Sequence, residues 1–263
     1  GKMDYLYDKV ETYDHLKAVI QNKTTPDGLS DIQHRMADIE HHMIHFLDNH
    51  DEQRLASPEF AGSGEKGKPL MVVSATISSS PTMIYFGQEV GEAGNENGGF
   101  GTRSRTSIFD YVGVPNHQRW MNGGKFDGGQ LSQSEKDLRD FYKRLLNFTI
   151  NSDALMGKFQ EIQTVNRQDT ANYDEKIYSY VRWSDNEKLI IVNNFDPNHT
   201  STFDLKLPSD IVNAWHLKDG VYPIKDQLYG TNTTLNIAHG VGLIKVTIKG
   251  SESFIFKFKD LSY

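Results

Sequence analysis

The sequence contains no cysteine, which excludes disulfide bonds, zinc–thiolate centres and a cysteine nucleophile. It has no apolar run approaching the roughly 18 residues that a membrane-spanning helix requires. A basic stretch is missing as well, and the formal net charge is −7. We therefore expect no nucleic-acid partner and no attachment to a membrane. The remaining composition, with 37% hydrophobic and 24% charged residues, is typical of a globular rather than a disordered chain.

The chain changes character near residue 155, which predicts one domain over residues 1–155 and a second over residues 156–263. In the first domain, helical patterns alternate with short apolar runs that have the composition of buried strands. Helices are predicted over residues 9–21, from Ser30, from about Pro69 and over Ser132–Ile150, and strands at Met43–Leu47 and Met83–Phe86. This order of strands and helices, with the strands buried on both faces, indicates a parallel sheet.

Two of these helices carry the pattern of a capping box, in which side chains at the first turn satisfy free backbone amides. Ser30 pairs with Gln33 in one helix, and Ser132 pairs with Glu135 in the other. The second helix is the better defined, since apolar side chains recur along one face at Leu138, Phe141, Tyr142, Leu145 and Leu146.

The second domain reads as short strands, because apolar and polar residues alternate with a period of two. Strands are predicted at Lys176–Trp183, Lys188–Asn193, Thr202–Leu207, Gly242–Lys249 and Ser253–Lys259. Turn-forming residues such as Asp196-Pro197-Asn198 and Lys249-Gly250 separate them. Many short strands at this spacing predict an antiparallel β-sandwich.

Polar side chains follow the predicted strand at Met43–Leu47, where Asp48, Asn49, His50 and Asp51 come in succession. Functional groups in parallel sheets gather just beyond the carboxyl ends of the strands. Carboxylates, together with groups that hydrogen-bond a distorted sugar ring, are what glycoside hydrolysis requires. The composition alone leaves an alternative open, namely a capped strand end with a buried aspartate–arginine pair.

The stretch Phe46–Asp51 resembles the pattern Phe-x-x-Asn-His-Asp of glycoside hydrolase family 13, the α-amylase family. Further matches follow in the order of the family along nearly the whole chain, at Pro81–Glu89, Arg105–Tyr111, Phe141–Leu145 and Val192–Phe195. They resemble the last barrel strand, a loop of bacterial members, the last barrel helix and a strand of the C-terminal β-domain. One departure is Ser79, where the family usually has glycine.

The resemblance assigns roles residue by residue. It implies that Asp51 is the third catalytic carboxylate, which stabilises the transition state and is not the nucleophile. It implies that His50 hydrogen-bonds the same sugar. Asn49 is expected either to orient the loop or to contact sugar directly. Arg54 is expected to contact substrate or to fix Asp51, with a structural salt bridge as the alternative. Tyr111 is a candidate for an acceptor subsite, with packing inside its own loop as the alternative.

The resemblance also implies an incomplete enzyme. The family's nucleophilic aspartate lies in a Gly-x-Arg-x-Asp stretch after the fourth barrel strand, and its general-acid glutamate follows the fifth strand. Neither stretch occurs here. The expected fold is therefore the C-terminal part of a (β/α)8 TIM barrel, about its last three strand–helix units, followed by the β-sandwich. We expect this chain to be inactive alone, as part of a retaining enzyme acting on starch or maltooligosaccharides.

No cofactor or metal is expected within the chain, because the histidines at 41, 42, 45 and 50 lack a zinc-site spacing. Calcium is common in the family, but its usual ligands lie in the missing part. Two alternatives stay open, a non-catalytic carbohydrate-binding or interaction module, and an inactive relative. A partial barrel leaves sheet edges and an apolar face open, which predicts self-association or binding of the missing N-terminal portion. The sequence leaves cellular location open, including export from a bacterium.

Overall fold

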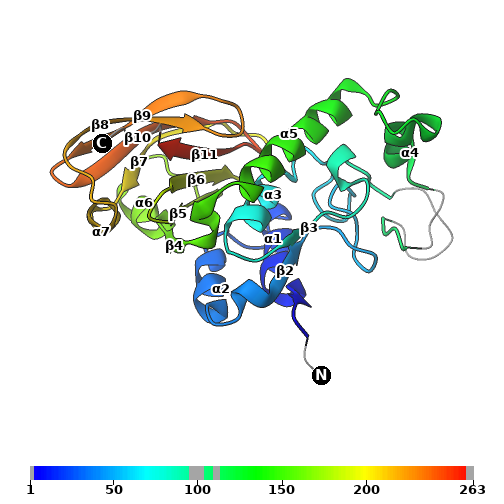
Figure 1. Ribbon diagram of the computed structural model, residues 1–263, viewed down its shortest axis with the longest axis horizontal. Coiled ribbons are helices and arrows are strands. Elements are labelled where there is room, and N and C mark those ends of the chain that lie inside the picture. Colours follow the sequence, from blue (N-terminus) through cyan, green and yellow to red (C-terminus); the bar gives the residue numbers. More distant parts are fainter. Residues whose placement is uncertain (1–2, 95–103, 109–112, 259–263) are drawn as a thin grey trace.

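The computed structural model describes residues 3–94, 104–108 and 113–258. Figure 1 shows a group of helices around three short strands, an all-β part to the left, and the long helix α5 passing above their junction. The elements of the first part are β1 Leu6–Tyr7, η1 Lys9–Tyr13, α1 Asp14–Ile20, α2 Gly28–Met36, η2 Glu40–His42, β2 Met43–Phe46, α3 Lys68–Thr76, β3 Thr82–Met83, η3 Gln88–Val90, α4 Pro115–Met121, η4 Asn122–Gly124, α5 Gln133–Ile150 and η5 Asp153–Met156.

The second part begins at β4. Its elements are β4 Lys158–Glu161, α6 Gln163–Asp169, β5 Ile177–Trp183, β6 Lys188–Asn194, β7 Ser201–Leu207, α7 Ser209–Ala214, β8 Gly220–Asp226, β9 Asn232–Ala238, β10 Val241–Ile248 and β11 Ser253–Phe258. None of the helices within the described ranges is long and apolar enough to cross a membrane.

The first part contains a three-stranded sheet in the order β1-β2-β3, and both strand pairs are parallel. Helices α1 and α2 connect β1 to β2, and α3 connects β2 to β3, so the predicted strand–helix alternation is confirmed. Strand β3 is shorter than predicted and ends at Met83. The chain turns soon afterwards at Gly87, whose φ of +81° is a left-handed conformation that favours glycine.

The helices pack on the sheet through the apolar residues that the periodicity identified. In α5 the buried positions include Leu138, Phe141, Tyr142 and Leu145. Its start is also as predicted, because Ser132 Oγ accepts from Glu135 N and the Glu135 carboxylate accepts from Ser132 N at 2.7 Å. Burial of this stripe against α3 fixes the helix over the sheet and the junction.

The capping box predicted at Ser30 is wrong. Helix α2 begins at Gly28, two residues earlier, with Asp27 at its N-cap and no side-chain cap. The Ser30 hydroxyl instead lies 3.1 Å from the Tyr178 hydroxyl of β5. A tertiary hydrogen bond to a strand far away in the sequence therefore uses the group that the local pattern assigned to a cap.

The second part is an eight-stranded sheet in the order β4-β5-β6-β11-β8-β9-β10-β7, and every pair in it is antiparallel. The predicted antiparallel all-β domain is confirmed, with a refinement. The strands form one hydrogen-bonded order, and the sheet curls so that strands distant in this order share one core. That core joins Val181 and Ile190 of β5 and β6 to Leu205 of β7 and Ile244 of β10.

The two parts share a second core rather than a flexible linker. The other face of β5 and β6 packs on α3, and Tyr178, Tyr180 and Ile191 belong to the same cluster as the helices. The Tyr180 hydroxyl lies 2.6 Å from Thr76 Oγ1 at the end of α3. Buried hydroxyls that meet across this contact give the junction a defined geometry.

Candidate functional site

The polar cluster of the sequence lies directly after β2, at the carboxyl end of the parallel sheet. Asn49 is buried, and its Oδ1 accepts from the backbone amides of Asp51 at 2.8 Å and Glu52 at 2.9 Å. This turn, in which a side chain replaces a backbone acceptor, holds the chain so that residues 50 and 51 point outward. These two hydrogen bonds are the contacts expected of a residue that orients the loop, and a direct contact of Asn49 with sugar stays a prediction.

Asp51 is the most exposed member of the cluster, with 66% of its side chain accessible. His50 Nε2 lies 3.2 Å from Asp51 Oδ2, and the His50 ring is 40% exposed. Arg105 approaches the same carboxylate, with Nη2 3.9 Å from Oδ1, and its Nε donates to the backbone carbonyl of His50 at 2.9 Å. The three side chains form an accessible group of one acid, one imidazole and one guanidinium.

Arg54 has a different environment. Its guanidinium is fully buried, and Nη1 lies 3.1 Å from Asp48 Oδ2 and donates to the Phe86 carbonyl at 2.8 Å. Its Nε donates to Thr106 Oγ1 at 3.1 Å, and the guanidinium stacks 4.7 Å from the Tyr85 ring centroid. Asp48 also accepts from the Leu55 amide. This placement matches the structural alternative, an ion pair with Asp48 rather than a contact to Asp51.

Burial raises the pKa of Asp48 above its usual range, while the adjacent Arg54 opposes that effect. The pair ties together the ends of β2 and β3, since Arg54 reaches a carbonyl that lies beyond β3. The Asp48–Arg54 ion pair is therefore a buried structural contact next to the Asn49–Asp51 turn, and it is not part of the exposed group of side chains.

A second buried carboxylate organises the segment after β3. Glu92 is 1% exposed, and it accepts from the amides of Gly94 at 3.1 Å, Asn116 at 2.9 Å and His117 at 3.3 Å. The last two amides belong to the first turn of α4, where a negative charge is stabilising. No sequence pattern singled out Glu92, because two of its three partner amides, those of Asn116 and His117, lie more than 20 residues away along the chain.

Arg105 was also not predicted as an individual residue, although it opens the stretch Arg105–Tyr111 that carried part of the family resemblance. Tyr111 itself lies outside the described residues, so its predicted acceptor role stays a prediction. Among the described residues, no group of three or more histidine, aspartate or glutamate side chains is placed to hold a metal ion.

Comparisons with known proteins find similarity to α-amylases, in sequence over the second part and in structure over nearly the whole chain. Residues 168–256 match the family model of the α-amylase C-terminal all-β domain. No curated protein sequence matches the chain. Among solved structures, a noncanonic maltogenic α-amylase from Thermotoga neapolitana has 18% identity and a TM-score of 0.62, over 97% of this chain and 51% of that one.

Two further structures show the same relation. An α-amylase from Geobacillus thermoleovorans, complexed with acarbose, has 14% identity and a TM-score of 0.66, covering 99% of this chain and 49% of that one. A variant of the protein AmyP, in complex with maltotriose, has 18% identity and a TM-score of 0.63, covering 98% of this chain and 50% of that one. At such identities the likeness shows a shared fold, and this chain spans about half the length of these structures.

The family model and the structural neighbours together confirm the resemblance to the C-terminal part of a glycoside hydrolase family 13 enzyme. The curled eight-stranded sheet corresponds to the all-β C-terminal domain of α-amylases. The three parallel strands precede this domain along the chain, in the region that the neighbours also cover.

Proposed function

We propose that this chain is the C-terminal part of a retaining glycoside hydrolase acting on α-glucans, in which Asp51 stabilises the transition state. The observation that carries the proposal is the exposed Asp51–His50 pair at the carboxyl end of a parallel strand. Active sites of parallel barrels lie at that end of the sheet. The neighbours crystallised with maltose, maltotriose and acarbose support an oligosaccharide as the ligand class.

In this proposal the chain supplies binding and electrostatic stabilisation but not the covalent chemistry. Carboxylates follow each of the three strands, yet Asp8, Asp48 and Glu92 are buried and engaged in hydrogen bonds. Asp51 is the exposed carboxylate that the family motif identifies. A retaining mechanism needs a nucleophile and an acid about 5–5.5 Å apart, and the motifs of both are missing from the sequence. We therefore propose that the chain has no hydrolytic activity alone.

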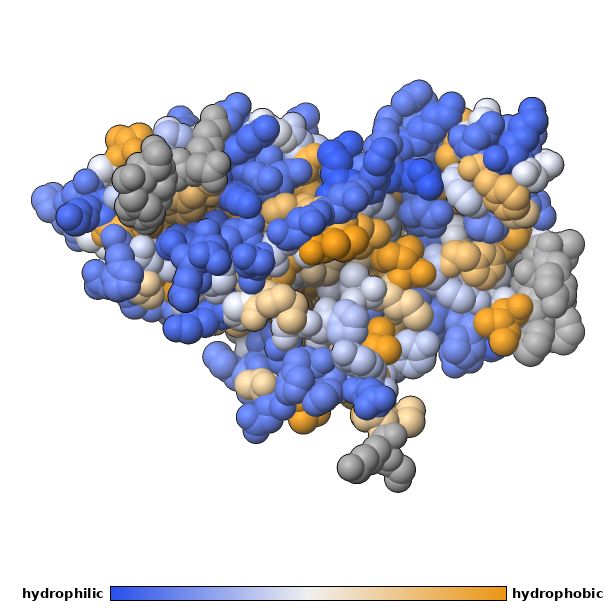
Figure 2. All heavy atoms as spheres, in the orientation of Figure 1, coloured by the Kyte–Doolittle hydropathy of each residue, from blue (hydrophilic) through white to orange (hydrophobic). Residues whose placement is uncertain are grey.

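The remaining barrel units are proposed as its natural partner. The sheet exposes apolar side chains at its β1 end, among them Tyr5 at 49%, Leu6 at 52% and Tyr7 at 45%. Figure 2 shows hydrophobic residues at the surface over the region of the parallel strands. Contiguous exposed apolar surface of this kind marks an interface. Any calcium ion would belong to the complete enzyme.

The test uses the longer protein that contains residues 1–263, with the substitution Asp51→Asn. Hydrogen bonds that strengthen in the transition state contribute several kcal/mol in glycosidases. We therefore expect kcat on maltooligosaccharides to fall by about 100-fold or more, because each 1.36 kcal/mol is a factor of ten, with a smaller change in KM. Asp140→Asn, at an exposed position of α5, serves as the control. An Asp51→Asn enzyme with unchanged kcat would refute the assignment.

A further inference from the structure

A cavity of about 590 Å3 lies at the junction of the two parts, where α2 and η2 approach β4 and β5. Its lining includes Gln33 and Glu40 from the first part, and Phe159, Gln160, Glu161 and Arg182 from the second. None of the residues of the Asn49–Asp51 turn lines it. A volume of this size is within the range of roughly 300–1,000 Å3 found for small-ligand sites.

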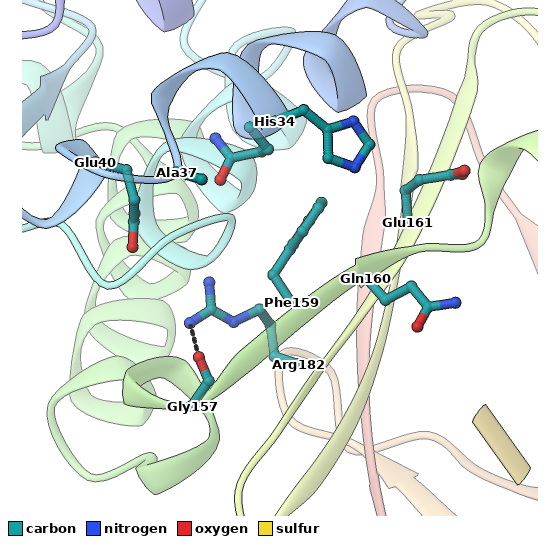
Figure 3. Close-up of a pocket in the computed structure, with 9 residues that line it drawn as sticks. His34, Ala37, Glu40, Gly157, Phe159, Gln160, Glu161 and Arg182 are labelled. Atoms are coloured by element: carbon teal, nitrogen blue, oxygen red, sulfur yellow. Dashed lines mark hydrogen bonds between the residues drawn. The ribbon is translucent and has the colours of Figure 1, made fainter. Parts of the chain in front are cut away.

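Arg182 is the most deeply buried polar residue among those that line this cavity. Its side chain is 1% exposed, and it donates to the backbone carbonyls of Ile77 at 2.6 Å and Leu155 at 2.5 Å. A third donation, shown in Figure 3, goes to the Gly157 carbonyl at 3.3 Å. Its Nε has no hydrogen-bond partner. Burial lowers the pKa of Arg182 to about 10, which still leaves it charged at neutral pH.

Three further polar side chains of the lining are held in place by protein contacts. Glu40 accepts from Ser79 Oγ at 2.8 Å. The amide of Gln160 donates to Asp210 at 2.7 Å, and Glu161 accepts from the Thr164 amide at 2.8 Å. Each contact fixes a side chain but leaves further hydrogen-bonding capacity, because a carboxylate has about four acceptor positions and an amide has two donors and an acceptor. Such pre-organisation reduces the entropic cost of binding.

Phe159 provides an apolar surface among these groups. Its ring is half-buried and lies 5.7 Å from the Tyr180 ring between centroids. In Figure 3 it extends between Arg182 and His34, toward the helix α2 side of the cavity. An aromatic face surrounded by fixed carboxylates and amides suits a ligand with one apolar face and a rim of hydroxyl groups.

The charge of the lining narrows the ligand class. Glu40 and Glu161 carry two negative charges against the single positive charge of Arg182, so the cavity disfavours anions. We propose that this cavity is a second carbohydrate site, which binds a short neutral α-glucan such as maltotriose. The choice of α-glucan over other neutral sugars rests on the proposed function. Since both parts of the chain line the cavity, a bound ligand also stabilises their junction.

The test is a calorimetric titration of the 263-residue chain with maltotriose, and with the β-linked cellotriose as a comparison. Ala37→Trp places an indole at an exposed position that lines the cavity, without removing a side-chain hydrogen bond. Asp38→Trp adds the same side chain one residue further along, at an exposed position outside the lining, and is the matched control.

We expect maltotriose to bind the wild-type chain and the Asp38→Trp variant with similar affinity, and the Ala37→Trp variant at least tenfold more weakly. Gln160→Ala, which keeps the cavity open and removes only an exposed hydrogen bond to Asp210, is expected to weaken binding severalfold. Equal binding to wild type and Ala37→Trp overturns the proposal, as does equal binding of cellotriose or an absence of maltotriose binding. None of these results bears on Asp51, whose role is measured separately by kcat of the longer protein.

Discussion

Replacing Arg54 with methionine tests whether this residue supports the loop or contacts substrate. Methionine keeps much of the volume of the arginine side chain but removes the charge that faces Asp48. In the wild-type chain the side chains of Arg54 and Asp48 are at most 1% exposed. Breaking a buried pair by removing one partner typically costs about 3–5 kcal/mol, since the other charge is left uncompensated. The Phe86 carbonyl and Thr106 Oγ1 also lose a donor. At about 2–4 °C per kcal/mol for a chain of this size, the midpoint of thermal unfolding should fall by about 10 °C.

The stability of the Arg54→Met variant should also depend on pH. Burial already raises the pKa of Asp48, and Arg54 lowers it, so Arg54→Met raises it further. A carboxyl group whose pKa is higher in the folded state than in the unfolded state binds protons more tightly when folded. The variant therefore regains stability as pH falls from the raised folded value toward the unfolded value near 3.8. The difference from wild type should be largest at neutral pH and narrow in acid.

The assay is thermal unfolding followed by circular dichroism at pH 7 and at pH 5, for wild type, Arg54→Met and the double variant Asp48→Asn/Arg54→Met. The double variant is expected to be more stable than Arg54→Met, because the neutral amide leaves no buried charge and can still accept from the Leu55 amide. A loss below about 1 kcal/mol for Arg54→Met, or a double variant that is no more stable, would refute the structural role.

Three further predictions concern stability and use urea unfolding. Asn49→Ala removes the acceptor of the Asp51 and Glu52 amides and should cost about 1–3 kcal/mol, whereas Asn49→Asp, which keeps the acceptor, should lose less. Ser132→Ala removes the N-cap of α5 and should cost about 1 kcal/mol, with Ser134→Ala as a control, so an equal loss for both would contradict the cap. Tyr180→Phe should cost about 1 kcal/mol through the bond to Thr76, whose hydroxyl also donates to the Val72 carbonyl, and no loss would show that the junction hydroxyls are dispensable.

The sequence predicted those parts of the fold that depend on local signals. The apolar stripe and capping box of α5, and the alternating pattern of the later strands, are each contained within a few turns or one strand. Ser30 shows the limit, because its hydroxyl is used by Tyr178, 148 residues away. The order of strands in the curled sheet shows the same limit, since β7 pairs with β10 and β8 pairs with β11, which are distant from them in the sequence.

The candidate site shows the same division. The motif at residues 49–51 locates the exposed acid and imidazole, because the motif is contiguous and follows a strand. The partner of Arg54 was left open between Asp48, Asp51 and substrate, since all three fit the composition and only the three-dimensional arrangement separates them. Glu92 and Arg182 act through backbone groups of distant segments, and backbone groups have no sequence signature. The cavity at the junction could not be predicted from the sequence either, because its lining combines residues 33–40 with residues 157–182.

We propose that this chain carries Asp51, the carboxylate that stabilises the transition state, but not the nucleophile and the general acid of a retaining glycosidase. The most direct test is the release of reducing sugar from soluble starch by a sample whose intact mass corresponds to the 29.9 kDa chain alone. We predict no release above the buffer control. Release by this chain, abolished by Asp51→Asn, would contradict the claim and require a catalytic pair within residues 1–263.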